Sequence, residues 1–195
     1  CPAGVQMDPL QMRLRAAVEP VTSRSPAERA LRHVVFRWLF MSMALFRALV
    51  AALWLYQRSG VQWLARRSGL LRLLRLDGME ALLPPLPARP VVARGQVEPA
   101  AEGTDAPLAV AFFAGCVMST ALAEIDRATV RVLRRAGCEV TLPAGQGCCG
   151  ALHGHAGDLE GLRTLARRTI DAFEAGGGAP IIVNSAGCVA VLKGS

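Results

Sequence analysis

Lysine and aromatic residues are scarce in this sequence of 195 residues. Lys193 is the one lysine among 22 Lys and Arg residues, and aromatic residues make up 5% of the chain. Nucleic-acid-binding domains combine basic charge with aromatic side chains and a recognisable motif. Because no such motif is present, we expect no nucleic-acid partner. A P-loop, G-x-x-x-x-G-K followed by Ser or Thr, is absent as well, which excludes that kind of nucleotide site.

An export signal is also missing. The sequence begins at Cys1-Pro2 without an initiator Met, a positively charged leader or a cleavage-site pattern, so we expect a cytoplasmic location and a chain cut from a longer protein. Six cysteines in a short secreted protein would suggest disulfides. In a cytoplasmic protein they favour a metal or redox site instead.

Charge is distributed unevenly along the chain. Residues 1–95 contain 14 Arg and 5 acidic residues, whereas residues 96–195 contain 8 Arg or Lys and 10 acidic residues. The basic half is compatible with an anionic membrane surface or an acidic partner protein. We therefore expect two parts of different character, and peripheral association of the basic part with a membrane on its cytoplasmic face.

The first part begins with a short segment, residues 1–24, and continues as a basic helical region, residues 25–81. Ser25, Pro26 and Glu28 form a capping-box pattern, which predicts a helix from Pro26 to about Gln57 that stops at Gly60. Trp38–Tyr56 is apolar except for Ser42 and Arg47. Since an Arg at the centre of a bilayer is costly, we expect this helix to be buried, or to lie against a membrane-associated partner, rather than to span a membrane.

A linker and an α/β region follow. Residues 82–107 hold six of the twelve prolines, which predicts a linker. In residues 108–195, strands are predicted at 108–114, 138–142 and 181–184, with helices at 122–136 and from Asp158 to about Gly176. Strands that alternate with helices of this length form βαβ crossovers and a parallel sheet.

Each predicted strand leads into a turn that contains cysteine. These cysteines are Cys116, the adjacent pair Cys148-Cys149, and Cys188. Because the carboxyl ends of parallel strands meet at one edge of a sheet, we expect the four thiols to converge there. Thiolates are ligands for iron–sulfur clusters and for structural zinc. Cys138 begins a strand instead, so we interpret it as a core residue.

The order Cys116, Cys148-Cys149-Gly150 and Gly187-Cys188 resembles the cysteine-rich "CCG" domain. This domain occurs in iron–sulfur subunits of glycolate oxidase, in lactate-utilisation proteins, and in subunits of anaerobic glycerol-3-phosphate dehydrogenase and of heterodisulfide reductase. The stretches 147–158, 167–173 and 183–188 are most similar to the glycolate oxidase subunits. Residues 1–5 resemble the end of the ferredoxin motifs in those subunits, where a Cys-Pro pair closes a cluster-binding run.

The resemblance implies an α/β fold: a parallel βαβ cysteine-rich domain, preceded by an all-α basic helical region and by the tail of a ferredoxin-like domain. It implies a non-catalytic subunit that relays electrons through 4Fe–4S clusters from a flavin subunit, which oxidises glycolate or a similar 2-hydroxy acid, towards a quinone-linked acceptor. The implied ligands are Cys1, Cys116, Cys148, Cys149 and Cys188. The sequence departs from the wider family because a C-x-x-C ending is missing at Cys188 and because it carries one copy of the domain.

Two other interpretations remain open from the residues alone. Four thiols also fit a structural zinc site used for assembly. Alternatively, Cys148-Cys149 could perform disulfide exchange without a metal if a thiol pKa were lowered. His153 and His155 follow the pair closely, and we expect them to shape the loop or hydrogen-bond to the site, because iron–sulfur clusters prefer thiolate ligands.

Overall fold

The computed structural model describes residues 7–194. Its centre is a four-stranded sheet in the order β1-β3-β2-β4. Strands β2 (Leu108–Phe113), β3 (Cys138–Leu142) and β4 (Ile181–Val183) are parallel, and β1 (Gln96–Glu98) pairs antiparallel with β3. The α/β fold with a parallel βαβ unit is therefore confirmed. Strand β1 is an addition within the proline-rich segment, where the sequence predicted a linker.

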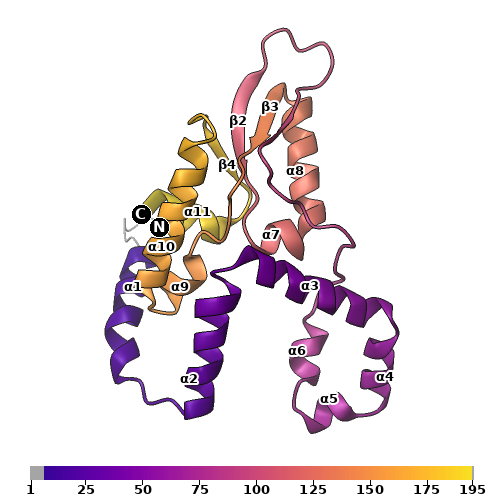
Figure 1. The fold of residues 1–195 in the computed structure, drawn as a ribbon, viewed down its shortest axis with the longest axis vertical. Helices are drawn as coiled ribbons and strands as arrows, with labels where there is room; N and C mark the ends of the chain where they lie inside the picture. Colours follow the sequence, from indigo (N-terminus) through magenta and orange to yellow (C-terminus); the bar gives the residue numbers. More distant parts are fainter. Residues whose placement is uncertain (1–6, 195) are drawn as a thin grey trace.

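Strand β2 carries the core of the sheet on both faces. Ala111 and Phe113 pack towards α10 (Leu159–Glu174) and α11 (Ala186–Gly194), whereas Val110 and Phe112 pack with β3 and the inner side of α8 (Ala123–Arg135). Successive side chains of a strand point to opposite faces, and a central strand buried on both faces is apolar throughout. This explains the continuous apolar run that marked the strand in the sequence. Helices cover both faces of the sheet, as Figure 1 shows.

The two long helices of the α/β unit begin and end where the sequence predicts. Asp158 caps α10 by accepting a hydrogen bond of 3.0 Å from the backbone N–H of Gly161. Helix α8 stops at Gly137, whose φ of +86° is readily adopted only by glycine. Three short helical segments follow the strand ends directly: α7 (Val117–Thr120) after β2, α9 (Ala151–His155) after β3, and α11 after β4.

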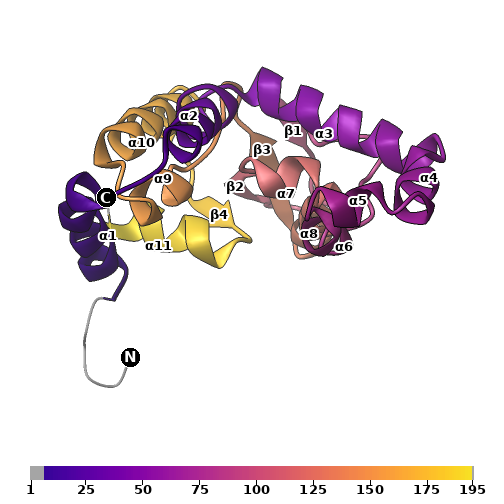
Figure 2. The same ribbon diagram turned by 90° about the horizontal axis from the view of Figure 1, so that it is seen from below.

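The amino-terminal part of the described chain is entirely helical. Helix α1 (Met7–Val18), followed by the short 3-10 turn η1 (Glu19–Val21), packs against α9. Helices α2 and α3 frame the lower side of the sheet, and the short helices α4 to α6 form a separate lobe (Figures 1 and 2). The bounds of these helices are Pro26–His33 for α2, Met43–Arg58 for α3, Val61–Arg67 for α4, Leu70–Leu73 for α5 and Asp77–Ala81 for α6.

The prediction of one continuous helix from Pro26 to about Gln57 is wrong. Its start is right, since Ser25 and Glu28 form both bonds of the capping box. However, α2 passes into a π-helical segment, η2 (Val34–Leu39), and the chain then turns before Ser42 caps α3. A π segment marks a local departure from regular helix, and Ser42 in an extended conformation starts a new one. The apolar residues at the bend pack onto the cysteine loops, and this packing stabilises the break.

No single described helix is long and apolar enough to cross a membrane. Residues Pro26–Leu39 and Met43–Arg58 pass that test of length and composition together, but they are bent by 109°.

Candidate metal centre

Four cysteines from three loops lie together at the carboxyl ends of the parallel strands. Cys116 follows β2, Cys148 and Cys149 follow β3, and Cys188 lies in the first turn of α11 after β4. The sulfur atoms of Cys149 and Cys188 are 3.2 Å apart, and Cys148 forms hydrogen bonds with both Cys116 and Cys149. The Cys188 sulfur also lies 4.0 Å from the position that a Cβ on Gly115 would occupy. The four thiols thus form one continuous row, as the sequence predicts.

Cys138 is remote from this row. It pairs in register with Leu108 at the beginning of β2, so it lies at the opposite end of the sheet. Four residues of strand separate it from Leu142, which corresponds to roughly 13 Å at about 3.3 Å per residue. Its side chain is buried in the core with Val110 and Val140. The interpretation of Cys138 as a core residue agrees with this position.

Polar donors surround the sulfur row. Cys116 accepts from the backbone N–H of Val117, Cys148 from that of Gly150 at 3.5 Å, and Cys149 from that of Ala151. The side chain of Ser185 bonds to Cys188. Gly150 has a φ of +87°, which turns the backbone so that these N–H groups face the thiols. Hydrogen bonds of this kind stabilise thiolate sulfur and help to set the potential of an iron–sulfur cluster.

The bend between η2 and α3 covers the row from the other side. Cys116 and Cys148 are packed with Phe46 of α3 and Leu165 of α10, and five apolar residues join this cluster: Leu39, Phe40, Met41, Met43 and Val50. We refer to residues 39–50 as the apolar lid. Cys116, Cys148 and Cys149 are each less than a tenth exposed, and Cys188 is half-buried. No sequence pattern signals this packing, because the lid and the cysteines are separated by more than 60 positions.

Mutual contacts and burial determine the pKa values of the thiols. The hydrogen bond with Cys116, assisted by burial, raises the pKa of Cys148 to about 12. The bond with Cys148 and burial raise the pKa of Cys149 to about 11, and the bond with Cys149 raises the pKa of Cys188. The pKa of Cys116 is lowered, chiefly because it accepts the hydrogen bond of Cys148. Neighbouring thiolates and Asp126 oppose ionisation of Cys188, so compensation by a cation would be needed to ionise the whole row.

The two histidines that follow the cysteine pair serve the loop. His153 is fully buried, its Nε2 lies 2.8 Å from the carbonyl oxygen of Phe36, and its ring meets the Phe36 ring edge-on at 5.1 Å. It thereby fastens α9 to η2. His155 lies 3.3 Å from Asp8 of α1. These positions agree with the expectation that both residues shape the loop.

Two buried polar groups hold the cysteine loops and were missed from the sequence. The Gln146 side chain bonds the N–H of Ala114 and the carbonyl of Phe112, both at 2.9 Å, and so extends the edge of β2 towards Cys116. Asp126 of α8 accepts a hydrogen bond of 2.8 Å from Asn184, in the loop that leads to Cys188. Gln146 stands two residues before the cysteine pair and Asn184 four before Cys188, and this proximity was the available signal.

The donor set fits a thiolate-ligated metal centre. Four thiols, three of them buried, are supplied by loops that also present N–H groups to the sulfurs, which suits iron–sulfur clusters or zinc. As they stand, the described residues contain no group of three or more His, Cys, Asp or Glu side chains spaced to hold a metal ion, and the thiols make pairwise contacts instead. Cys1, the fifth expected ligand, lies outside the described residues.

Residues 145–150 also match the spacing G-x-G-x-x-G of dinucleotide-binding turns. That motif needs a long helix whose amino terminus meets the pyrophosphate. Here the helix that follows, α9, has five residues, and two of the variable positions carry the buried thiols Cys148 and Cys149. The segment is therefore suited to a thiol site and not to a dinucleotide.

The sheet, the strand-end cysteines and the Cys-Cys-Gly turn define an α/β cysteine-rich domain. Residues 110–193 match the family described as "Cysteine-rich domain", and residues 27–83 match "Glycolate oxidase iron-sulfur subunit, linker region". The chain belongs to the family of glycolate oxidase iron–sulfur subunits. The matched ranges lie on either side of the proline-rich segment.

Individual relatives agree with this membership. A probable glycolate oxidase iron–sulfur subunit of Bacillus subtilis is 39% identical over 98% of this chain and 44% of its own length. Lactate utilization protein A of an Exiguobacterium species is 34% identical over 43% of this chain and 34% of its own. One of the subunits of the CoM/CoB fumarate reductase of Methanothermobacter marburgensis is 39% identical over 43% and 17%. The chain thus spans less than half the length of these relatives. No solved structure matches it.

Proposed function

We propose that this chain is the central part of a subunit that relays electrons in a 2-hydroxy-acid oxidase complex, and that Cys116, Cys148, Cys149 and Cys188 hold an iron–sulfur cluster of the 4Fe–4S type. The convergence of four thiols at one sheet edge carries the proposal. Membership of the glycolate oxidase subunit family supports it.

When bound, the cluster would supply storage of one electron at a time. The residues of this chain would hold and tune it. The thiols would bind as thiolates, and the N–H groups of Val117, Gly150 and Ala151 would stabilise negative charge on sulfur. The apolar lid would exclude water from the Cys116 and Cys148 side. A dry, hydrogen-bonded sulfur environment is a principal means by which a protein sets a cluster potential.

The raised pKa values of Cys148 and Cys149 favour ligation over thiol chemistry. A nucleophilic cysteine needs a thiolate near neutral pH, which requires a lowered pKa. The pKa values of about 12 and about 11 keep both members of the pair protonated in the absence of a metal. Metal-free disulfide exchange by Cys148-Cys149 is therefore the weaker alternative, and structural zinc is the alternative that the donor set also fits.

The partners belong to the same proposal. A flavin-containing subunit would deliver electrons from glycolate or a similar acid, and a quinone-linked acceptor would receive them at the cytoplasmic face of a membrane. Peripheral attachment is supported by the lobe of α4 to α6, where Trp63, Leu73, Met79 and Leu82 are between 63% and 83% exposed. Its exposed arginines are Arg66, Arg67, Arg72 and Arg75. Such mixed apolar and cationic surfaces suit the interface of an anionic bilayer.

The test is anaerobic purification of the full-length parent, followed by measurement of iron, acid-labile sulfide and zinc per chain. Iron and sulfide that disappear in part when Cys149 is changed to Ser, with the remainder held by clusters elsewhere, would support the assignment. Zinc in place of iron at this centre, shown by a colourless sample whose metal loss on Cys149→Ser is zinc alone, would refute electron relay.

A further inference from the structure

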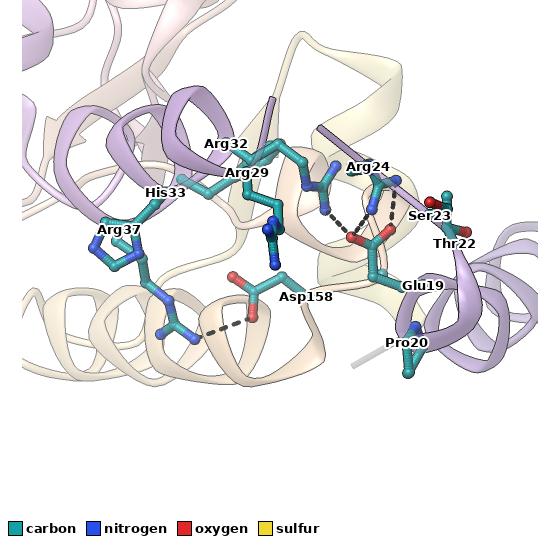
Figure 3. Close-up of a pocket in the computed structure, with 12 residues that line it drawn as sticks. Glu19, Pro20, Thr22, Ser23, Arg24, Arg29, Arg32, His33, Arg37 and Asp158 are labelled. Carbon is teal, nitrogen blue, oxygen red and sulfur yellow. Dashed lines mark hydrogen bonds and ion pairs between the residues drawn. The ribbon is translucent and has the colours of Figure 1, made fainter. Parts of the chain in front are cut away.

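A cavity of about 650 Å³ lies between helix α2 and the turn that joins α9 to α10. Figure 3 shows the guanidinium groups of Arg24, Arg29, Arg32 and Arg37 at this cavity, together with the carboxylates of Glu19 and Asp158. Arg29, Arg32 and His33 come from α2, Arg37 comes from η2, and Asp158 caps α10. The cavity is separate from the cysteine row.

Positive charge exceeds negative charge in this cavity. Arg24 and Arg32 both pair with Glu19, Arg32 at 2.9 Å. Arg37 lies 3.8 Å from Asp158 and 3.3 Å from Glu160, whose side chain is largely exposed at the rim. Arg29 and His33 form no hydrogen bond or ion pair with the part of the chain that the structure describes. The guanidinium of Arg29 lies between the Glu19 pairs and Asp158 in Figure 3. An open position for an anion therefore faces Arg29.

We propose that this cavity binds a phosphate-bearing ligand, a phosphate monoester or a diphosphate. Four guanidinium groups and two carboxylates on its walls leave two positive charges, which a phosphate with a charge near −2 would neutralise and a monocarboxylate would not. Arginine presents several N–H donors in a planar fork that matches phosphate oxygens. The volume is in the range of small-molecule sites, about 300–1,000 Å³, so it accommodates a group larger than inorganic phosphate alone.

Such a ligand would join the helical region to the cysteine-rich domain. Arg32 already donates to the carbonyl of Ala156 at 3.0 Å, and Phe36 accepts the His153 bond one turn further along. A phosphate between Arg29 and Arg37 would add a second bridge from α2 and η2 to the turn at Gly157-Asp158. The occupied cavity would therefore hold the apolar lid more firmly over the thiols.

Titration calorimetry of the full-length parent with pyrophosphate, and separately with inorganic phosphate, tests the site. We expect saturable binding of pyrophosphate that weakens as salt is raised. Arg29→Ala should weaken it by about 10- to 100-fold, the effect of losing a charged hydrogen-bond partner, and Arg29→Lys should lose less. Arg58→Ala is the matched control: Arg58 is exposed at the end of α3, outside the cavity. Bound iron should not change in any of these variants, which separates this test from that of the cluster.

Vesicles distinguish the source of the phosphate. If phosphatidylglycerol vesicles compete with pyrophosphate and Arg29→Ala abolishes the competition, the ligand is a lipid headgroup; without competition it is a soluble phosphate compound. Absence of saturable pyrophosphate binding, or equal weakening by Arg29→Ala and Arg58→Ala, would overturn the proposal.

Discussion

Replacing Gly150 with Ala should damage the cysteine loop through two separate effects. The φ of +87° at this residue is strained for any L side chain, at a cost of about 1–2 kcal/mol. In addition, an added Cβ would lie 2.8 Å from the Leu162 Cδ1 atom and 3.2 Å from the Leu162 backbone. Overpacking of this kind costs about 1–3 kcal/mol. The combined loss in the free energy of unfolding is about 2–5 kcal/mol, and the shift of the Gly150 N–H away from Cys148 should lower cluster occupancy.

Gly60→Ala is a matched control for the backbone term. Gly60 has a φ of +82° but no atom within 4 Å of its Cβ position, so only the conformational cost of about 1–2 kcal/mol applies. Urea denaturation followed by circular dichroism, with bound iron measured in parallel, compares the two variants with the parent. If Gly150→Ala is no more destabilising than Gly60→Ala and retains all its iron, then the close approach of Leu162 does not constrain the loop and our reasoning about the turn fails.

Three further predictions concern the thiols, a buried acid and the helical lobe. Cys148→Ser should remove metal from this centre and Cys138→Ser should leave it, as metal analysis will show; the reverse pattern would contradict the ligand set. Burial raises the pKa of Asp126 from 3.8 to about 6, against the weaker opposing effect of Asn184. The folded state then holds a proton that the unfolded state has released, so stability falls as pH rises from about 4 to about 6; Asp126→Asn should flatten this part of the curve of urea midpoint against pH, and an unchanged curve would exclude Asp126 as its source. Carbonate extraction should release the subunit from membranes, whereas retention after removal of its partners would favour a membrane-spanning helix pair.

The α/β half of the fold is predictable because local patterns and global packing agree there. The apolar run at Leu108–Phe113, the Asp158 cap and the glycine stop at Gly137 each specify one structure without help from distant residues. The convergence of the cysteines then follows from topology alone. Strand β1 was not predictable in this way, since three residues in a proline-rich segment form a strand only by pairing with β3.

The break in the first helix was hidden for a related reason. Residues 34–42 are as compatible with a continuous helix as with a bend, and the choice depends on what the apolar side chains pack against. Phe40 and Met43 find their partners at Cys116 and Cys148, far along the chain. The cavity of arginines was likewise unpredictable, because Asp158 and Gly157 come close to α2 only through the tertiary fold.

The position of the apolar lid has a consequence for biosynthesis. Residues 39–50 leave the ribosome before any of the four cysteines, and their packing partners are completed only when Cys188 has been made and β4 has joined the sheet. The lid contacts are among the longest-range contacts of the chain, and contacts that close such long loops form late in folding. The sulfur row therefore stays open to the surrounding solution during synthesis, and a cofactor delivered at that stage would be enclosed by the final folding step.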